Sequence, residues 1–278
     1  MRRQAVQKII ILIALMAIAF PLLAQSTEAD LKARLKDKTL YLRGCWGGSN
    51  LTFDGTGKFI GTPSPASFTL SGFELKSLQL KDGKLTLKGK RMGIEFVKGK
   101  QRFVPIHIDD PKIEITAPTN GDFGPALDAI FTNSLESLTS PLPVYWETWG
   151  RKNLPAAYAG RPISTIDEPQ EGEEDQPETS SEKPKQVKGN VLAPRVLEHS
   201  EAEFDDAARK LKYSGKCTIR LIVGTDGRPR HVRIETPTGL GLDEEAVTAV
   251  QQYLFAPSTQ NGKPVPVEIA IEVNFQVF

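Results

Sequence analysis

Side chains that could do acid–base, metal or nucleophilic chemistry are few and scattered in this sequence. The histidines are His107, His199 and His231, and none stands in a metal-binding spacing such as H-x-x-x-H. The sequence contains neither a G-x-S-x-G nor a C-x-x-C motif. These patterns argue against an enzyme, and they predict no catalytic residue, no bound cofactor and no metal site.

Two acidic patterns resemble fragments of a site. Asp243, Glu244 and Glu245 could supply paired carboxylates, but acids in the first turn of a helix are already favoured by its positive end. Residues 224–228 (GTDGR) resemble part of a calcium loop, but the remaining acidic ligands are missing. We interpret both patterns as structural.

The two cysteines, Cys45 and Cys217, exclude a disulfide-stapled scaffold. Cys217 shares strand parity with Ile219, Leu221 and Val223, which predicts that its thiol points into an apolar core. A Cys45–Cys217 bridge is the less favoured alternative in an exported chain.

The amino-acid composition is typical of a globular protein. The chain has 278 residues, 39% of them hydrophobic and 25% charged, with a formal net charge of +1. This length and composition predict two modest cores rather than one large core. No region carries the basic excess that phosphate binding requires, so nucleic acid is not an expected partner.

The first 26 residues are typical of an export signal. Arg2, Arg3 and Lys8 precede an apolar run over residues 9–24, and small or polar residues follow. We expect a signal peptide that is cleaved near Ala24. An uncleaved membrane anchor is the alternative, although the run falls short of the roughly 20 apolar residues needed to span a bilayer.

The pattern of residues 27–150 predicts a β-rich domain of unknown role. We expect an antiparallel meander or a small barrel, together with a helix. Apolar and polar residues alternate in several short runs, and the Asp54-Gly55 and Asp82-Gly83 pairs signal hairpins. A helix is expected over residues 124–138, where Leu127, Ile130, Phe131, Leu135 and Leu138 follow helical spacing. Trp146 and Trp149 are interpreted as closing a small core rather than forming a ligand platform.

Residues 151–190 predict a flexible linker. The stretch is rich in acids and prolines, and no aromatic residue lies between Tyr158 and Phe204. Such a composition buries too little apolar surface to fold by itself, and its proline and like charges favour an extended chain.

Residues 191–278 predict a compact α+β domain. Ser200 and Glu203 form a capping-box pattern before one helix, and Asp243 is the expected N-cap of a second. Between these helices, residues 221–235 (LIVGTDGRPRHVRIE) have the pattern of a hairpin.

The alternating run at the C-terminus, from Val265 to Phe278, suggests a function in binding another protein. Apolar residues repeat with period two over about 14 residues from Val265, roughly 45 Å if continuous, so this strand should overhang its partner. An unpaired sheet edge is a template for adding a strand from another protein. The candidate partner-binding residues are Ile269, Ile271, Glu272, Val273, Asn274 and Phe275. Alternatively, both edges are covered by the first domain or by a second copy.

Residues 204–278 resemble the TonB C-terminal domain family in the order and spacing of several marks. These are the helix ending in YSG, the GTDGRP turn, GLGLDEEAV opening the second helix, F-x-P, NGKPV and a terminal strand ending in Phe. The resemblance implies a periplasmic domain of two helices on a three-stranded antiparallel sheet. It also implies that the last strand pairs with a segment of TonB-dependent outer-membrane receptors, with inner-membrane motor proteins supplying the energy.

The sequence departs from the transducers of that family in two respects. Its N-terminal apolar segment lacks the Ser or His that they use against the motor, and its linker is short and acidic. The leading hypothesis is therefore receptor binding by strand addition in support of transmembrane transport. The alternative is an envelope scaffold or adaptor that forms a homodimer through its C-terminal domain and is not coupled to the motor.

Overall fold

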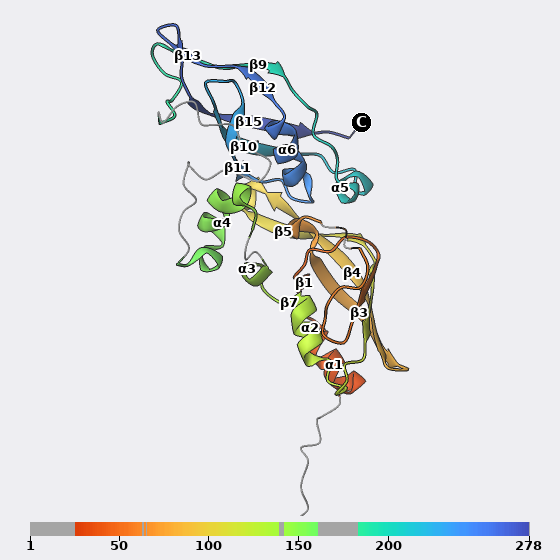
Figure 1. Cartoon of the computed structure of the whole chain (residues 1–278). Coiled ribbons are helices and arrows are strands. Elements are labelled where there is room, and N and C mark those ends of the chain that lie inside the picture. Colours follow the sequence, from red (N-terminus) through yellow and green to blue (C-terminus); the bar gives the residue numbers. More distant parts are fainter. Residues whose placement is uncertain (1–25, 63, 65, 139–141, 161–182, 278) are drawn as a thin grey trace, which may run out of the picture.

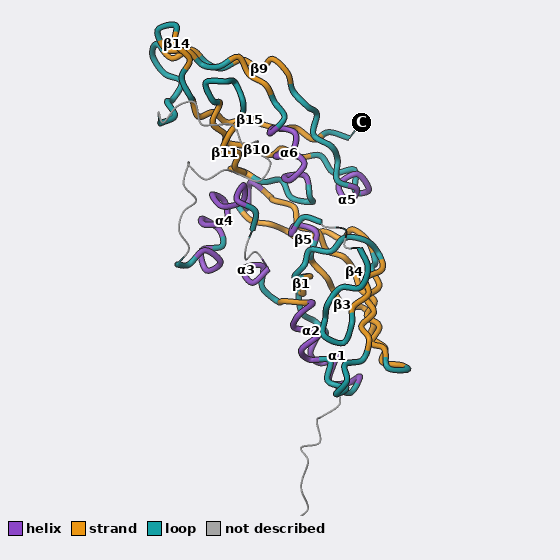
Figure 2. Tube along the Cα trace, in the orientation of Figure 1, coloured by secondary structure: helices purple, strands orange, loops and turns teal. Residues whose placement is uncertain are grey.

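The structure is a computed structural model in which two β-sheets, one from each half of the chain, pack end to end (Figure 1). It describes residues 26–62, 64, 66–138, 142–160 and 183–277. The mixed α+β class expected from the sequence is confirmed. Figure 2 shows more strand than helix in both halves, and the helices are short.

The N-terminal sheet has seven strands in the order β2-β6-β4-β3-β1-β7, with β5 pairing to the far half of β4. The strands are β1 (Leu40–Leu42), β2 (Asn50–Phe53), β3 (Gly72–Lys81), β4 (Lys84–Val97), β5 (Arg102–Asp109), β6 (Lys112–Thr116) and β7 (Phe131–Thr132). Asp82 and Gly83 join β3 to β4 with positive φ angles of 50° and 69°, as the predicted hairpin requires. The expected purely antiparallel arrangement differs in one pairing, because β2 runs parallel to β6.

Two short helices cover one end of this sheet: α1 (Glu28–Leu35) and α2 (Gly124–Ile130). Thr27 and Asp30 form a capping box at the start of α1. The helix expected over residues 124–138 is shorter than predicted. Phe131 leaves it to pair with Leu42 of β1, and helical structure resumes only in α3 (Leu135–Leu138).

Beyond α3 the chain forms η3 (Val144–Trp146), α4 (Glu147–Asn153) and η4 (Pro155–Tyr158). The first ten residues of the predicted linker therefore lie in or beside helical turns. Residues 161–182, the most acidic part of that linker, lie outside the described residues, as do residues 1–25 of the signal peptide predicted over residues 1–26. Within the described ranges, no helix is long and apolar enough to cross a membrane.

The C-terminal half is built on a three-stranded antiparallel sheet in the order β11-β10-β15. Its strands are β10 (Gly215–Val223), β11 (Pro229–Thr236) and β15 (Val267–Phe275). Helix α6 (Leu242–Gln251) buries Ala246, Val247 and Val250 against the sheet. Cys217 is buried in that core as predicted, and both cysteines are free.

The expected helix caps of this half are wrong. The N-cap of helix α5 (Asp206–Lys210) is Asp205, whose side chain accepts from the Ala207 N–H at 2.7 Å, so Ser200 and Glu203 lie before the helix. The N-cap of α6 is Gly241. Asp243 instead points back and accepts from the backbone N–H groups of Thr238 and Gly239, each at 2.7 Å.

Two further small sheets lie beside this core. Their five strands are β8 (Val191–Leu192), β9 (Arg195–Glu198), β12 (Leu254–Ala256), β13 (Thr259–Gln260) and β14 (Lys263–Pro264). Strand β9 pairs with β12, and β8 pairs with β13. They bring the chain that follows residue 183 alongside the C-terminal sheet (Figure 1).

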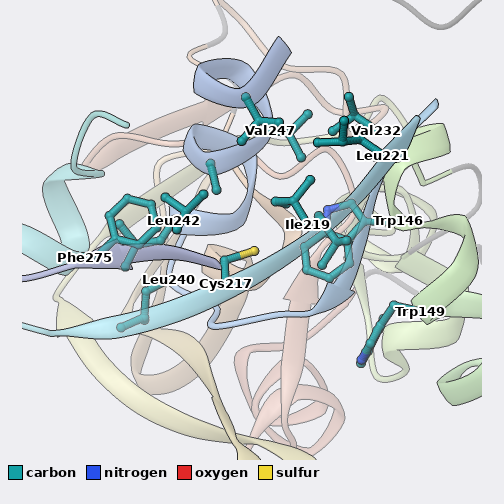
Figure 3. Close-up of a cluster of buried hydrophobic side chains, with 14 of the residues drawn as sticks. Trp146, Trp149, Cys217, Ile219, Leu221, Val232, Leu240, Leu242, Val247 and Phe275 are labelled. Atoms are coloured by element: carbon teal, nitrogen blue, oxygen red, sulfur yellow. The ribbon is translucent and has the colours of Figure 1, made fainter. Parts of the chain in front are cut away.

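The two halves share a core. Trp146 and Trp149 are buried in the cluster that also contains Ile219, Leu221 and Val232 of the C-terminal sheet (Figure 3). The two tryptophan rings stack edge to face with 5.5 Å between centroids. The tryptophans therefore close a core, as expected, but it is the core between the two halves.

Backbone pairing also joins the halves. Gly239 forms an antiparallel bridge with Glu95 of β4. The Phe96 N–H donates to the Thr238 carbonyl at 2.8 Å, and the Leu240 N–H donates to the Ile94 carbonyl at 3.1 Å. Gly239 has φ +93°, and a side chain there would collide with the Ile94 carbonyl oxygen, so this close approach requires glycine.

A carboxyl group links the same surfaces. Glu244 Oε1 accepts from Trp146 Nε1 at 3.0 Å and from Ser67 Oγ at 2.9 Å, while its buried Oε2 has no hydrogen-bond partner among the described residues. Burial, reinforced by the nearby charge of Asp243, raises the pKa of Glu244 to about 8. The interface between the halves therefore holds this group in its neutral form near pH 7.

Glu244→Gln tests this linkage, because it keeps an acceptor oxygen but cannot ionise. The folded protein holds the Glu244 proton up to about pH 8, whereas the unfolded chain releases it near 4.5. The stability that the neutral group contributes is complete below pH 4.5 and is lost as the pH rises through about 8. Between pH 5 and pH 9, the free energy of unfolding of the variant should rise relative to wild type by about 4 kcal/mol, since about three pH units at about 1.4 kcal/mol each separate pH 5 from the folded-state pKa.

Urea denaturation at the two pH values measures this difference. Glu201→Gln, at an exposed position, is the matched control and should follow the wild-type profile. Parallel loss of stability in wild type and Glu244→Gln would contradict the neutral, buried state of the carboxyl group.

Candidate functional site

The last strand lies at the edge of the C-terminal sheet. β15 pairs with β10 along its whole length, from Gly215↔Phe275 to Val223↔Val267, without a register shift. Both strands have nine residues, so the predicted overhang is wrong. Pro266 has no N–H to continue the ladder, and the Val265 N–H donates to the Ser258 carbonyl instead, which ends the strand early.

The opposite edge of this sheet is covered. Helix α4 and the turn η3 pack against β11, and the chain just beyond β11 pairs with β4 through Gly239. The alternative that the first domain covers an edge therefore holds for β11. The exposed edge comes from the strand order, not from an overhang.

Backbone groups of alternate β15 residues point out of the sheet. The Glu268 N–H and the Pro266 carbonyl bond to Lys185, which lies on the side away from β10. Since outward-facing residues recur with period two in an unbroken ladder, the backbone groups of Ala270, Glu272 and Asn274 also face outward. In the described part of the chain, these three residues have no backbone partner on that side.

The structure divides the six candidate residues into two groups. Glu272 and Asn274 present their backbone groups to the open edge and their side chains to solvent. The other four direct their backbone groups to β10 and their side chains to the core; these are Ile269, Ile271, Val273 and Phe275. Ala270 belongs with the first group. The sequence places Ala270 at the same parity as Glu272, but the apolar repeat marks only the residues of the opposite face.

The two faces beside the open edge differ in chemistry. On the inner face Ile269 and Ile271 remain half-buried, so part of their apolar surface is available to an added strand. On the outer face Lys216 Nζ lies 2.6 Å from Glu272 Oε1, and Arg220 lies 3.5 Å from Glu268. These ion pairs are solvent-exposed and contribute little stability, so they are free to rearrange around a partner.

The residues screened for catalysis lie on separate elements. His107 is in β5 with Nε2 3.0 Å from the Asp109 carbonyl, His199 follows β9 with its ring against Tyr253, and His231 is in β11. Among the residues that the structure describes, no group of three or more His, Cys, Asp or Glu side chains could hold a metal ion. Asp243 and Glu244 have the structural contacts given above, although the first-turn pattern did not reveal their burial.

Comparison with known proteins identifies this part of the chain. Residues 200–277 match the family described as Gram-negative bacterial TonB protein C-terminal. Among solved structures, the chain is similar to the solution NMR structure of the Pseudomonas aeruginosa TonB CTD, with 16% identity and a TM-score of 0.26 over 32% of this chain and 89% of that chain. No curated protein matches the chain. The family match spans α5, α6 and all three strands of the C-terminal sheet, so residues 200–277 belong to the TonB C-terminal domain family.

Proposed function

We propose that the open edge of β15 binds an extended segment of an outer-membrane receptor by strand addition, in a TonB-like role that supports energy-dependent transport. One observation carries this proposal. The backbone groups of Ala270, Glu272 and Asn274 face outward, while the other edge of the sheet is covered. Main-chain hydrogen bonds would provide the affinity, and the side chains flanking the edge would provide the selectivity.

Family membership supports the proposed partner and place. Proteins of the TonB family are associated with the cell envelope, and outer-membrane receptors are the expected partners of their C-terminal domain. A periplasmic location also agrees with the export signal expected over residues 1–26. We propose no catalytic activity for this edge, since its exposed groups are backbone amides, carbonyls and paired surface charges.

Glu272→Pro and Asn274→Pro test the edge, because each removes one outward N–H without touching the bonds to β10. Each variant should bind a receptor peptide about tenfold more weakly, as expected for one lost hydrogen bond and the misfit of the proline ring. Isothermal titration calorimetry with synthetic peptides from the N-terminal segments of outer-membrane receptors measures this change.

Glu272→Ala and Asn274→Ala are the matched controls, since they keep the backbone N–H and alter only the side chain. Their affinities should stay within about twofold of wild type, with backbone pairing carrying most of the binding. Unchanged affinity in both proline variants, with circular dichroism showing an intact fold, would reject β15 as the binding strand.

A second candidate function is an envelope adaptor that dimerises by pairing two β15 edges. The same outward-facing groups favour it, because an open edge accepts a copy of itself as readily as a receptor segment. Sedimentation equilibrium of the mature protein separates the two functions. A receptor-binding edge predicts a monomer across the concentration range, and a self-paired edge predicts a dimer that dissociates on dilution.

The N-terminus decides whether the protein stays coupled to the inner membrane. We propose that residues 1–24 are removed, which leaves a chain that begins near Gln25 without its own anchor. The intact mass of protein isolated from its native envelope should then lack the first 24 residues. A mass that includes Met1, found in the membrane fraction, would instead support an anchored transducer that works with motor proteins.

A further inference from the structure

The chain itself occupies the start of the β15 edge. Lys185 lies beside Val267 in a parallel bridge. Its N–H donates to the Pro266 carbonyl at 2.8 Å, and its carbonyl accepts from the Glu268 N–H at 3.1 Å. In a parallel ladder each residue bonds to the two residues that flank its neighbour, so Lys185 fills one complete ladder position.

Contacts on its C-terminal side hold this residue in place. Lys185 Nζ donates to Gln260 Oε1 of β13 at 2.9 Å. The chain then turns at Lys188, whose carbonyl accepts from the Val191 N–H at 3.1 Å, and enters β8 beside β13. Asn190 adds hydrogen bonds to Gln260 and Asn261. The pairing at Lys185 is therefore part of an anchored segment.

We propose that the segment around Lys185 acts as an intramolecular strand that regulates the β15 edge. Within the described ranges it leaves the outward backbone positions from Ala270 to Asn274 free and blocks those around Pro266 and Glu268. This inference rests on the proposed function, because it concerns the same edge. A short partner segment binds beside the Lys185 segment, whereas a longer one must first displace it.

The free energies involved favour a limit on the length of the partner segment that binds the edge. Displacing Lys185 breaks two backbone hydrogen bonds, each worth about 1 kcal/mol, and a longer partner replaces them with two equivalent bonds. The Lys185 segment is tethered, and its effective concentration is on the order of millimolar, above that of most free partners. A longer partner segment therefore binds little more tightly than a shorter one as long as Lys185 stays paired with β15.

Lys185→Pro removes the N–H that bonds to Pro266, and Lys185→Ala is the matched control that keeps it while losing the contact with Gln260. The probes are two synthetic peptides of alternating valine and lysine, about 7 and about 11 residues long. Valine suits the half-buried Ile269 and Ile271, and lysine suits Glu268 and Glu272 on the other face.

Calorimetry on the full chain should show that the shorter peptide binds all three proteins with the same Kd within about twofold. The longer peptide should bind Lys185→Pro about tenfold more tightly than wild type or Lys185→Ala, the equivalent of one to two hydrogen bonds. Amide exchange at Glu268 should accelerate in Lys185→Pro, while unchanged exchange at Ile219 shows that the sheet is intact.

Equal affinity of the longer peptide for wild type and Lys185→Pro overturns the inference. Failure of both peptides to bind either protein rejects strand addition itself, and with it the proposed function. If the shorter peptide binds, and the longer peptide gains no more affinity in Lys185→Pro than in wild type, the proposed function stands. Only the regulatory role of Lys185 is then rejected.

Discussion

The C-terminal sheet depends on how the backbone groups at its two edges find partners. Three strands leave two edges, each with a row of N–H and C=O groups. At β11 the N-terminal half covers the edge with η3 and α4 and pairs β4 with Gly239. If both edges were open, β11 of one molecule could pair with β15 of the next, a head-to-tail contact that does not close and leads to filaments. Covering the β11 edge leaves the β15 edge as the open edge of this sheet among the described residues.

The contact between the halves fixes which edge is covered, and a buried carboxyl group contributes to its geometry. Apolar contacts around Trp146 and Trp149 supply buried apolar surface between the halves, but they tolerate small rotations of one half relative to the other. The hydrogen bonds from Trp146 and Ser67 to one oxygen of Glu244 require one relative orientation. A neutral acid serves this purpose better than a carboxylate, because an ionised group with an unpartnered oxygen would be costly to bury.

Local patterns in the sequence predicted the parts of this structure that local forces determine. The period-two repeat places Ile269 and Ile271 on the core face, and Asp82-Gly83 forms its hairpin. What the patterns missed has two origins. Asp243 binds the amides of the preceding loop, four and five positions earlier, instead of capping its helix. The donors to Glu244 lie 98 and 177 positions away in the sequence. The sequence shows which β15 residues alternate together, and therefore which backbone groups share a side of the strand. Which edge of the sheet stays open depends on the packing of the two halves.

The orientation of the Lys185 segment adds to the physical case for strand addition. β10 runs antiparallel to β15, whereas Lys185 lies parallel to it, so the sheet is already mixed at its outer position. Lys185 pairs with this edge without distorting β15, whose register against β10 shows no shift from Val267 to Phe275. Since the outward groups beyond Glu268 continue the same ladder, a strand that follows Lys185 in the same direction meets the geometry that Lys185 itself uses.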